Sequence, residues 1–364
     1  MPSYMMPTRS LPGMRRRGFL VAAGLAGLIS ADPASALPAR IMQFPRDYGS
    51  HPDFSIEWWY ITGHAHAGSR EFGFQLTFFR SRVNGTQGMA SKFAAKQLLF
   101  AHAAITDVGG NKLWHDQRIA RVGFGVASAS ETDMALKLRD WSLQNQSGRY
   151  SANLPATDFG LKLQFTETQA VLLQGQQGLS RKGPDEKQAS YYYSQPQLAT
   201  SGSLRLQDKT FEVQGTAWLD HEWSQELLHP SAIGWDWIGM NLDDGSALTA
   251  FRLRRIDGSA VWDGGSFRSA KNALQTFSRG EVVFKPVRSW TSPLTQTSYP
   301  VEWTVQTPTD VYTVKAVIDN QELDSRQSTG AIYWEGLSDL INSKGQRVGR
   351  GYLEMTGYAS PLRM

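Results

Sequence analysis

Residues 57–63 read Glu-Trp-Trp-Tyr-Ile-Thr-Gly, and residues 72–78 read Phe-Gly-Phe-Gln-Leu-Thr-Phe. The first stretch is rich in aromatic and β-branched residues, and the second alternates large apolar side chains with small or polar ones. The turn between them, residues 67–70 (Ala-Gly-Ser-Arg), predicts an antiparallel hairpin. The same alternation recurs along the chain, whereas only residues 90–99 and 335–341 suggest short helices. We therefore expect a mostly antiparallel, all-β protein.

A repeat with an offset of 177 residues indicates two copies of this unit. Trp58 precedes a Gly-Ser turn by ten residues, and Trp235 precedes a second Gly-Ser turn by the same distance. We place the boundary near residue 226, which gives an N-terminal domain of residues 37–226 and a C-terminal domain of residues 227–364. The charged, Gly-rich segment 174–193 is expected to be an exposed loop whose end folds back as a strand or lid.

Residues 1–36 have the features of a twin-arginine export leader. Three arginines at 15–17 are followed by Gly-Phe-Leu, an apolar run extends to about residue 29, and Ala34-Ser35-Ala36 offers a small-residue cleavage site. We expect a periplasmic or secreted protein that is cleaved near Ala36. The apolar run is shorter than a bilayer span, so no stable membrane insertion is expected.

Composition excludes several other classes of function. The chain has no Cys, which rules out disulfides, thiolate metal sites and Cys nucleophiles. The leader carries most of the formal net charge of +4, and the remainder is nearly neutral and has no general attraction for nucleic acid. The sequence also lacks a G-x-S-x-G nucleophile elbow and a phosphate-binding P-loop.

The densest group of chemically active side chains lies between residues 220 and 237. It comprises Asp220-His221-Glu222-Trp223 and Trp235-Asp236-Trp237. A carboxyl group among aromatic rings has a raised pKa and can donate a proton, and indole faces stabilise a developing carbocation. The same residues would also suit a Trp-rich core between domains, in which carboxylates accept hydrogen bonds from indole N–H groups. The residues alone leave both interpretations open.

Two further segments pair Trp with Glu, namely 57–60 (Glu-Trp-Trp-Tyr) and 333–335 (Tyr-Trp-Glu). On a strand, Glu57 and Trp59 share one face while Trp58 and Tyr60 share the other. Glu354, near the C-terminus, is expected to be structural.

The histidines do not predict a metal site. His64 and His66 share a strand face but would need His51 or His102 as a third ligand, and an accidental H-x-H is common enough at this composition. We predict no metal and no cofactor.

The sequence motifs of this chain resemble, in the same order, those of the lipocalin-like AttH and carotenoid 1,2-hydratase (hydroxyneurosporene synthase) superfamily. The segments that carry the resemblance are Glu57 to His64, Asp220 to Ser224, Gly234 to Trp237, Tyr333 to Gly336 and Gly351 to Tyr358. The resemblance implies two tandem lipocalin-like antiparallel β-barrels with a lipophilic ligand inside or between them. Members of the superfamily hydrate carotenoid double bonds, catalyse pericyclic cyclisation, or are exported proteins of which some are linked with ABC transport systems.

One departure from the carotenoid hydratases concerns the proton donor. Their His-x-Trp motif carries over onto His221 and Trp223, and the resemblance implies a Tyr-x-Asp pair on a following strand. The corresponding residues 249–253 here are Thr-Ala-Phe-Arg-Leu, with neither Tyr nor carboxylate. Asp220, Glu222 or Asp236 would then have to supply the proton.

The sequence thus predicts an exported protein that acts on a lipophilic small molecule by hydrating an isolated C=C bond. The alternative is a non-catalytic periplasmic lipid-binding or accessory protein of an ABC transport system. The predicted catalytic residues are Asp220, His221, Glu222 and Asp236. The predicted ligand-binding residues are Glu57, Trp58, Trp59, Tyr60, Trp223, Trp235, Trp237, Trp334 and Glu335.

Overall fold

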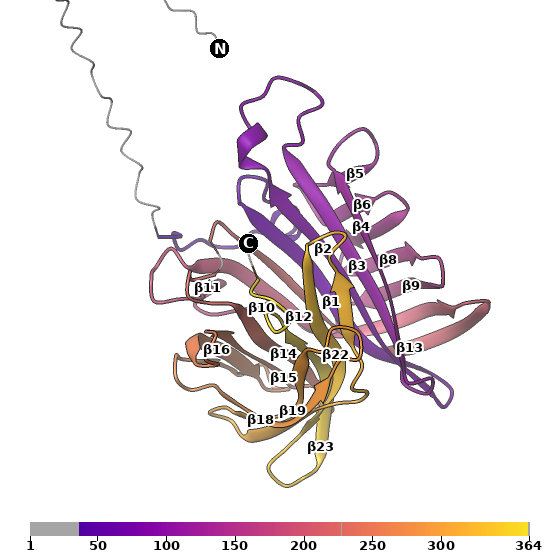
Figure 1. The fold of residues 1–364 in the computed structure, drawn as a ribbon, viewed down its shortest axis with the longest axis vertical. Coiled ribbons are helices and arrows are strands. Elements are labelled where there is room, and N and C mark those ends of the chain that lie inside the picture. Colours follow the sequence, from indigo (N-terminus) through magenta and orange to yellow (C-terminus); the bar gives the residue numbers. More distant parts are fainter. Residues whose placement is uncertain (1–35, 227, 363–364) are drawn as a thin grey trace, which may run out of the picture. The chain divides into compact units, whose positions relative to one another are not determined.

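The computed structural model describes residues 36–226 and 228–362, which are built almost entirely from β-strands (Figure 1). The predicted leader, apart from Ala36, lies outside the described residues. Within the described ranges, the helical elements are two short 3-10 turns, η1 (Arg46–Tyr48) and η2 (Asn84–Thr86). No helix in these ranges is long and apolar enough to cross a bilayer.

The first sheet contains thirteen antiparallel strands and curls into a nearly closed barrel. Its strands, in spatial order, are β4 (Lys112–Arg121), β3 (Gln97–Asp107), β2 (Arg70–Arg82), β1 (Ile56–Ala67), β13 (Lys209–Ser224), β12 (Ala189–Leu206), β9 (Phe159–Thr166), β8 (Arg149–Pro155), β7 (Trp141–Gln146), β6 (Ala135–Leu138) and β5 (Ala127–Ala129). Two short strands, β10 (Leu172–Leu173) and β11 (Leu179–Arg181), add to β12.

The second sheet contains ten antiparallel strands, all C-terminal to the first sheet. Their spatial order is β17 (Leu274–Phe277), β16 (Ala260–Arg268), β15 (Ala247–Arg254), β14 (Gly234–Leu242), β23 (Arg347–Met355), β22 (Ala331–Ile341), β20 (Val311–Ala316), β19 (Ser298–Gln306) and β18 (Val283–Thr291), with β21 (Glu322–Ser325) paired to β22. The prediction of an all-β protein with two antiparallel units is confirmed.

The two sheets begin in the same way, as the 177-residue repeat suggests. Trp58 lies on β1 and Trp235 on β14, and each of these strands pairs with the next strand in sequence and with the last strand of its sheet. The turns that follow contain Gly68 and Gly245, which have φ angles of 59° and 88°. This left-handed conformation favours glycine because an added Cβ would be strained there.

The expectation of short helices was wrong. Residues 335–341 belong to β22, where they pair with β20 and β23. Residues 90–99 form turns that lead into β3. In β22 the pairing on both sides outweighs the local helical pattern, because sheet packing decides the conformation of short ambiguous segments.

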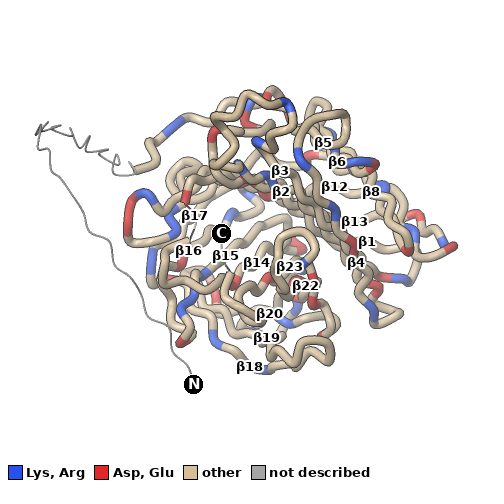
Figure 2. Tube along the Cα trace, turned by 45° about the horizontal axis from the view of Figure 1, so that its top comes forward, with Lys and Arg blue, Asp and Glu red and all other residues tan. Residues whose placement is uncertain are grey.

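The three largest apolar clusters of the described residues divide the molecule into layers. One fills the first barrel, one fills the concave side of the second sheet, and one lies between the two sheets, with Tyr60, Trp218, Trp237 and Phe251 among its members. Lys and Arg are interspersed with Asp and Glu along both sheets (Figure 2).

Close contact between the sheets depends on a glycine in β2. A Cβ on Gly73 would lie 2.7 Å from the Tyr352 hydroxyl and 3.0 Å from the Leu337 Cβ atom. Polar contacts join the same layers: Thr106 donates a hydrogen bond to Gln321 at 2.8 Å, because β3 and the segment before β21 meet there. The layer between the sheets is therefore a packed interior that contains polar groups.

Candidate functional site

The pairing of β1 with β13 sends neighbouring residues of both Trp-rich motifs to opposite faces. Residues directly opposite each other in an antiparallel pair share one face of the sheet. The opposing pairs are Glu57 with Trp223, Trp58 with Glu222, Trp59 with His221, and Tyr60 with Asp220. The first and third pairs project into the first barrel, while the second and fourth face the second sheet. The single pocket expected from the sequence is therefore two separate clusters.

Inside the first barrel, a buried ion network surrounds Glu57. Its carboxylate accepts hydrogen bonds from Arg80 Nε at 2.8 Å and from the backbone N–H of His51 at 2.9 Å. The imidazoles of His51 and His221 lie 2.7 and 3.0 Å from Glu57 Oε1. We call Asp47, His51, Glu57, Arg80 and His221 the barrel cluster. Although burial opposes ionisation, hydrogen bonds from His221 and His51 hold the pKa of Glu57 well below its usual range.

The barrel cluster does not suit a metal ion. His51, Glu57 and His221 offer ligand atoms within 4.8 Å of one another, which is compatible with a metal in geometry alone. The Arg80 guanidinium, however, already neutralises Glu57, and that carboxylate is saturated with hydrogen-bond donors. A cation would have to displace a buried arginine that has no other carboxylate partner. The cluster is instead a satisfied polar core.

His221 is thus a packing residue of the barrel. It is completely buried, stacks on Trp59 with ring centroids 4.7 Å apart, and contacts the Asp47 carbonyl at 3.1 Å. Burial lowers its pKa to about 4, with only partial compensation from Glu57. Trp223 stacks on His51 in the same interior. These positions give no support to the expectation that His221 and Trp223 face a ligand.

Asp236 and Trp334 likewise turn into the second sheet's own interior. Asp236 accepts hydrogen bonds from Arg252 Nε at 2.6 Å and from the Tyr358 hydroxyl at 2.8 Å. Trp334 donates from its indole nitrogen to the Asp319 carbonyl at 2.7 Å. Neither residue lines a cavity between the sheets, because each alternates with a neighbour that does.

The other cluster lines a cavity of about 110 Å³ between the two sheets, which we call the interface cavity. Its walls contain seven of the predicted residues, namely Trp58, Tyr60, Asp220, Glu222, Trp235, Trp237 and Glu335. They also contain Thr77, Phe79, Lys182, Tyr192, Leu228, Phe251, Leu253, Tyr333 and Glu354. Four carboxyl groups, one ammonium group and many aromatic rings therefore meet in a small enclosed space.

Asp220 is held as a hydrogen-bond acceptor at one wall. Tyr192 donates to Oδ2 at 2.8 Å, while Ser194 and the Trp218 indole donate to Oδ1 at 2.5 and 2.7 Å. Burial nevertheless raises the pKa of Asp220 to about 7, because removal from water disfavours the charged form more than these donors favour it. Its acceptor positions are already used, so this carboxyl is fixed in orientation.

Glu222 is the carboxylate that carries a counter-ion. Lys182 Nζ lies 2.9 Å from Glu222 Oε1, and Ser190 donates to the same oxygen. The ammonium group also lies 4.4 Å from the Phe251 ring centre and 4.8 Å from that of Tyr192, which are cation–π distances. Lys182 therefore connects the segment after β11 to the floor of the cavity.

Glu335 and Glu354 face each other directly across β22 and β23. Glu335 Oε2 accepts a hydrogen bond from Gln75 at 2.7 Å, whereas Oε1 is buried with only the Tyr60 hydroxyl beside it. Burial and the neighbouring Glu354 raise the pKa of Glu335 well above its usual range. Burial also raises the pKa of Glu354 to about 7, with added repulsion from Asp220 and Glu222. Both carboxyl groups therefore favour the protonated form more than an ordinary glutamate does.

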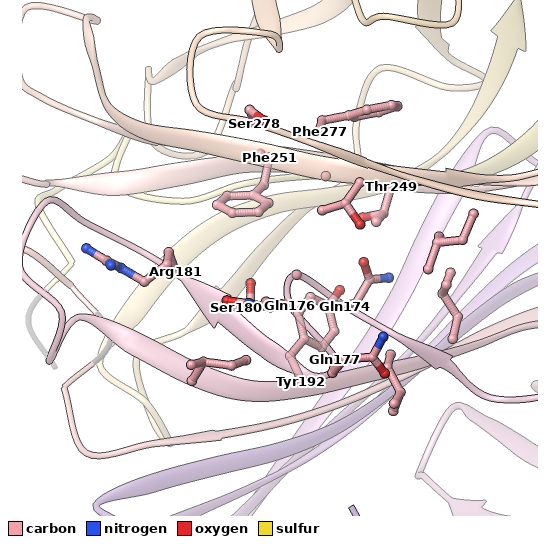
Figure 3. Close-up of a pocket in the computed structure, with 18 of the residues that line it drawn as sticks. Gln174, Gln176, Gln177, Ser180, Arg181, Tyr192, Thr249, Phe251, Phe277 and Ser278 are labelled. Carbon is pink, nitrogen blue, oxygen red and sulfur yellow. The ribbon is translucent and has the colours of Figure 1, made fainter. Parts of the chain in front are cut away.

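A second, wider cleft of about 1010 Å³ adjoins the interface cavity. Figure 3 shows Thr249 and Phe251 of the second sheet facing Gln174, Ser180 and Tyr192 of the first. Tyr192 and Phe251 line both spaces, so the interface cavity and the wide cleft share these two walls. A molecule larger than the interface cavity could place its body in the cleft.

Sequence reasoning missed Lys182, Tyr192 and Glu354. Glu354 was assigned a structural role, although its spacing within the last strand gives the same face as Tyr352. The Tyr191-Tyr192-Tyr193 run was noted as a strand or lid, and β12 does begin at Ala189. Lys182 had no local signal, because its partner Glu222 is 40 residues away in the sequence.

Comparisons with known proteins agree with this architecture. A family model described as AttH-like matches residues 35–358. A solved AttH structure from Nitrosomonas europaea is 45% identical, covers 89% of this chain and 99% of its own, and superposes with a TM-score of 0.83. Kievitone hydratase from Nectria haematococca is 13% identical, covers 88% of this chain and 94% of its own, and has a TM-score of 0.69, which shows a shared fold. Among curated proteins, none matches the chain.

Proposed function

The chain belongs to the AttH-like family, and from this premise we propose that it binds a lipophilic small molecule at the interface cavity and adds water to an isolated C=C bond. The observation that carries the proposal is the buried Glu335 carboxyl, which has a raised pKa, an oxygen with no partner beyond the Tyr60 hydroxyl, and aromatic neighbours in one cavity. The match to the AttH-like family model and the fold shared with kievitone hydratase both support this proposal.

Glu335 is the best placed proton donor of the four carboxyl groups. Glu222 is paired with Lys182, and Asp220 is held by three hydrogen-bond donors. A general acid needs a proton at the working pH and an open path to the substrate. Glu335 meets both conditions best, since burial raises its pKa well above the usual range and its Oε1 atom has no protein partner apart from the neighbouring Tyr60 hydroxyl.

The reaction would proceed in two steps that balance in atoms and charge. The Glu335 proton adds to one alkene carbon, the π electrons form the new C–H bond, and a tertiary carbocation remains on the other carbon. The faces of Trp58, Trp235 and Trp237 stabilise this cation. Water then forms a C–O bond to the cation and loses its extra proton to a carboxylate of the cavity, for which Glu354 is the nearest partner of Glu335 in the strand register.

The wide cleft supports a second candidate, a non-catalytic lipid-binding or accessory protein. Its volume of about 1010 Å³ reaches the upper end of the range for small-molecule sites, about 300–1,000 Å³. A carrier would use the same cleft without proton transfer. In either case, we propose that the twin-arginine leader exports the protein to the periplasm or beyond, where a carrier would act beside an ABC transport system.

The test is turnover of isoprenoid alkenes with a trisubstituted terminal double bond in ¹⁸O-labelled water. We expect an alcohol that contains the label, and Glu335→Gln should lower the rate by about 10²–10⁴-fold, the usual contribution of a general acid. Glu212→Gln is the matched control, because Glu212 is an exposed carboxylate on β13.

The two candidates give different results for the same variant. A carrier binds the alkene with equal affinity in the wild type and in Glu335→Gln and forms no labelled product in either. Hydration that continues at the wild-type rate in Glu335→Gln would remove Glu335 as the acid.

A further inference from the structure

We propose that the interface cavity recognises compact organic cations, so that its ligands include molecules carrying a tertiary or quaternary ammonium group. The inference rests on the proposed function only in taking this cavity as the ligand site. It does not depend on hydration, and it names a class of ligand that neither a carotenoid nor a simple alkene represents.

The balance of charge in the cavity favours a cationic guest. Asp220 and Glu222 project from β13, and Glu335 and Glu354 project from β22 and β23. Lys182 is the one basic side chain among the described lining residues, and it is used by Glu222. A buried carboxyl without a counter-ion is costly in its charged form, and a guest cation would remove that cost.

The aromatic walls are of the kind that bind ammonium groups. Trp58, Trp235 and Trp237 line the cavity, with Tyr60, Tyr192, Phe251 and Tyr333 completing the lining rings. The cation–π contacts of Lys182 with Tyr192 and Phe251 show that these faces already accommodate a positive charge in this structure. Aromatic cages of this composition recognise quaternary ammonium ions, for which hydrogen bonding is not possible.

A pair of buried polar atoms with no partner outside the pair points to a missing ligand. Apart from each other, Tyr60 Oη and Glu335 Oε1 have no hydrogen-bond partner in the protein, and both residues line the cavity. Their residues are 7% and 3% exposed. Buried polar atoms normally find a partner, and a protonated tertiary amine or a hydrated ammonium group would provide one.

The size of the cavity restricts the guest to a compact group. A volume of about 110 Å³ holds several water molecules, because each requires roughly 10–15 Å³ in this measure. A small substituted ammonium head is of that order, whereas the rest of a larger ligand would extend past Tyr192 and Phe251 into the wide cleft. The same aromatic and acidic walls would serve a carbocation in the proposed hydration.

Several titratable and charged groups surround Glu335 and Glu354 and therefore influence the pKa values of these two carboxyls. They are Tyr60 on β1, Lys182 after β11, Tyr192 on β12, Asp220 and Glu222 on β13, Tyr333 on β22 and Tyr352 on β23. A permanent cation favours the ionised carboxylates and therefore lowers their pKa values. Binding should release a proton where these carboxyls are protonated, and affinity should rise with pH up to about 7.

The experiment is isothermal titration calorimetry of the mature protein with choline and with its neutral carbon isostere, dimethylbutanol. We expect choline to bind at least about tenfold more tightly at about pH 8, with an affinity that falls toward about pH 6. Titrations in two buffers of different ionisation enthalpy should show proton release near pH 6. Glu354→Gln should weaken choline at least about tenfold and leave dimethylbutanol unchanged, while Glu212→Gln should alter neither.

Equal affinity for the two probes, or choline binding without any proton release or pH dependence, would overturn the inference. Proton release by the wild type tests it even if Glu354→Gln does not fold. The outcome is separate from that of the proposed function: failed choline binding alongside Glu335-dependent hydration removes only the cation site. Choline binding without hydration of any alkene removes only the reaction.

Discussion

Glu57 and Glu335 are both buried glutamates on strands, yet their environments give them opposite properties. Glu57 is surrounded by Arg80, two imidazoles and a backbone N–H, which keep it charged. Glu335 has one donor, Gln75, while burial and the neighbouring carboxyl of Glu354 raise its pKa well above the usual range. The first side chain therefore stabilises the fold, and the second is available for chemistry.

The residue that holds Glu57 in its charged form is Arg80. Arg80→Met should destabilise the protein by about 3–5 kcal/mol, because removing one partner leaves a buried charge uncompensated. Equilibrium unfolding in urea measures this loss. Arg288→Met is the control, since its pairs with Glu302 and Asp319 are partly exposed and should contribute no more than about 1 kcal/mol.

Equal losses for Arg80→Met and Arg288→Met would mean that the barrel cluster is not a buried charge network. Turnover should be affected by Arg80→Met only to the extent that the folded fraction falls.

The sequence predicts which residues share a face of a strand. It does not predict which of the two faces contacts the second sheet. Alternation alone assigns Trp58 and Tyr60 to one face and Glu57 and Trp59 to the other, as observed. Which face meets the second sheet depends on the packing of β1 against β23, of β2 against β22 and of β13 against β14. That contact joins residues more than 200 positions apart, so no local pattern reports it.

At the scale of elements, β22 and β23 form the acidic wall of the cavity. Glu335 and Glu354 occupy directly opposing positions, and like charges in such positions destabilise a sheet. The pair is tolerated because burial raises the pKa values of both carboxyls above the usual range, which reduces their charge. The opposing carboxyl pair destabilises the fold, and it lies at the proposed site.

Glu354→Gln should change the pH dependence of stability in a defined direction. The pKa of Glu354 is raised to about 7, above its unfolded value of about 4.3. Ionisation of Glu354 therefore lowers the stability of the folded wild type as pH rises from about 4 to about 7. The variant lacks this loss. Its stability relative to the wild type should therefore increase between about pH 4 and pH 7, by at most about 1.4 kcal/mol per pH unit.

Urea denaturation of both proteins across this range measures the difference, with Glu212→Gln as the exposed control. A gap between Glu354→Gln and wild type that stays constant with pH would show that Glu354 ionises normally. The comparison between variants is needed because the partly buried His64 and the buried His102 and His221 have lowered pKa values and act in the opposite direction.

The element boundaries show what local patterns can and cannot determine. The hairpin of β1 and β2 was predictable from alternation and from its Gly-Ser turn. Residues 335–341 were not assigned correctly, because a short segment gains its strand conformation from partners on both sides. The short strands β10 and β11 exist only as additions to β12 and have no periodicity of their own.

At the scale of the whole molecule, the described part of the chain is one compact unit whose site needs both sheets. Asp220 and Glu222 come from the first sheet, and Glu335 and Glu354 come from the second. Hydrogen bonds such as His102 to the Tyr333 hydroxyl at 2.7 Å join the layers. The first sheet ends at Ser224 and the second begins at Gly234, near the predicted boundary. A shared apolar layer nevertheless packs the two sheets against each other.

We therefore expect the two sheets to unfold together. Differential scanning calorimetry of the protein should give a single transition whose calorimetric and van't Hoff enthalpies agree. Two resolved transitions would show that each sheet is stable without the other and that their shared layer contributes little.

The raised pKa values of Glu335 and Glu354 imply that carboxyl groups of the interface cavity still carry protons at neutral pH. The most direct measurement is infrared difference spectroscopy of the carbonyl stretch of protonated carboxyls during a pH titration. We expect bands that persist to about pH 7 in the wild type and decrease in Glu335→Gln/Glu354→Gln, while Glu212→Gln retains them. Complete ionisation of every carboxyl by about pH 5.5, as for ordinary Asp and Glu, would contradict it.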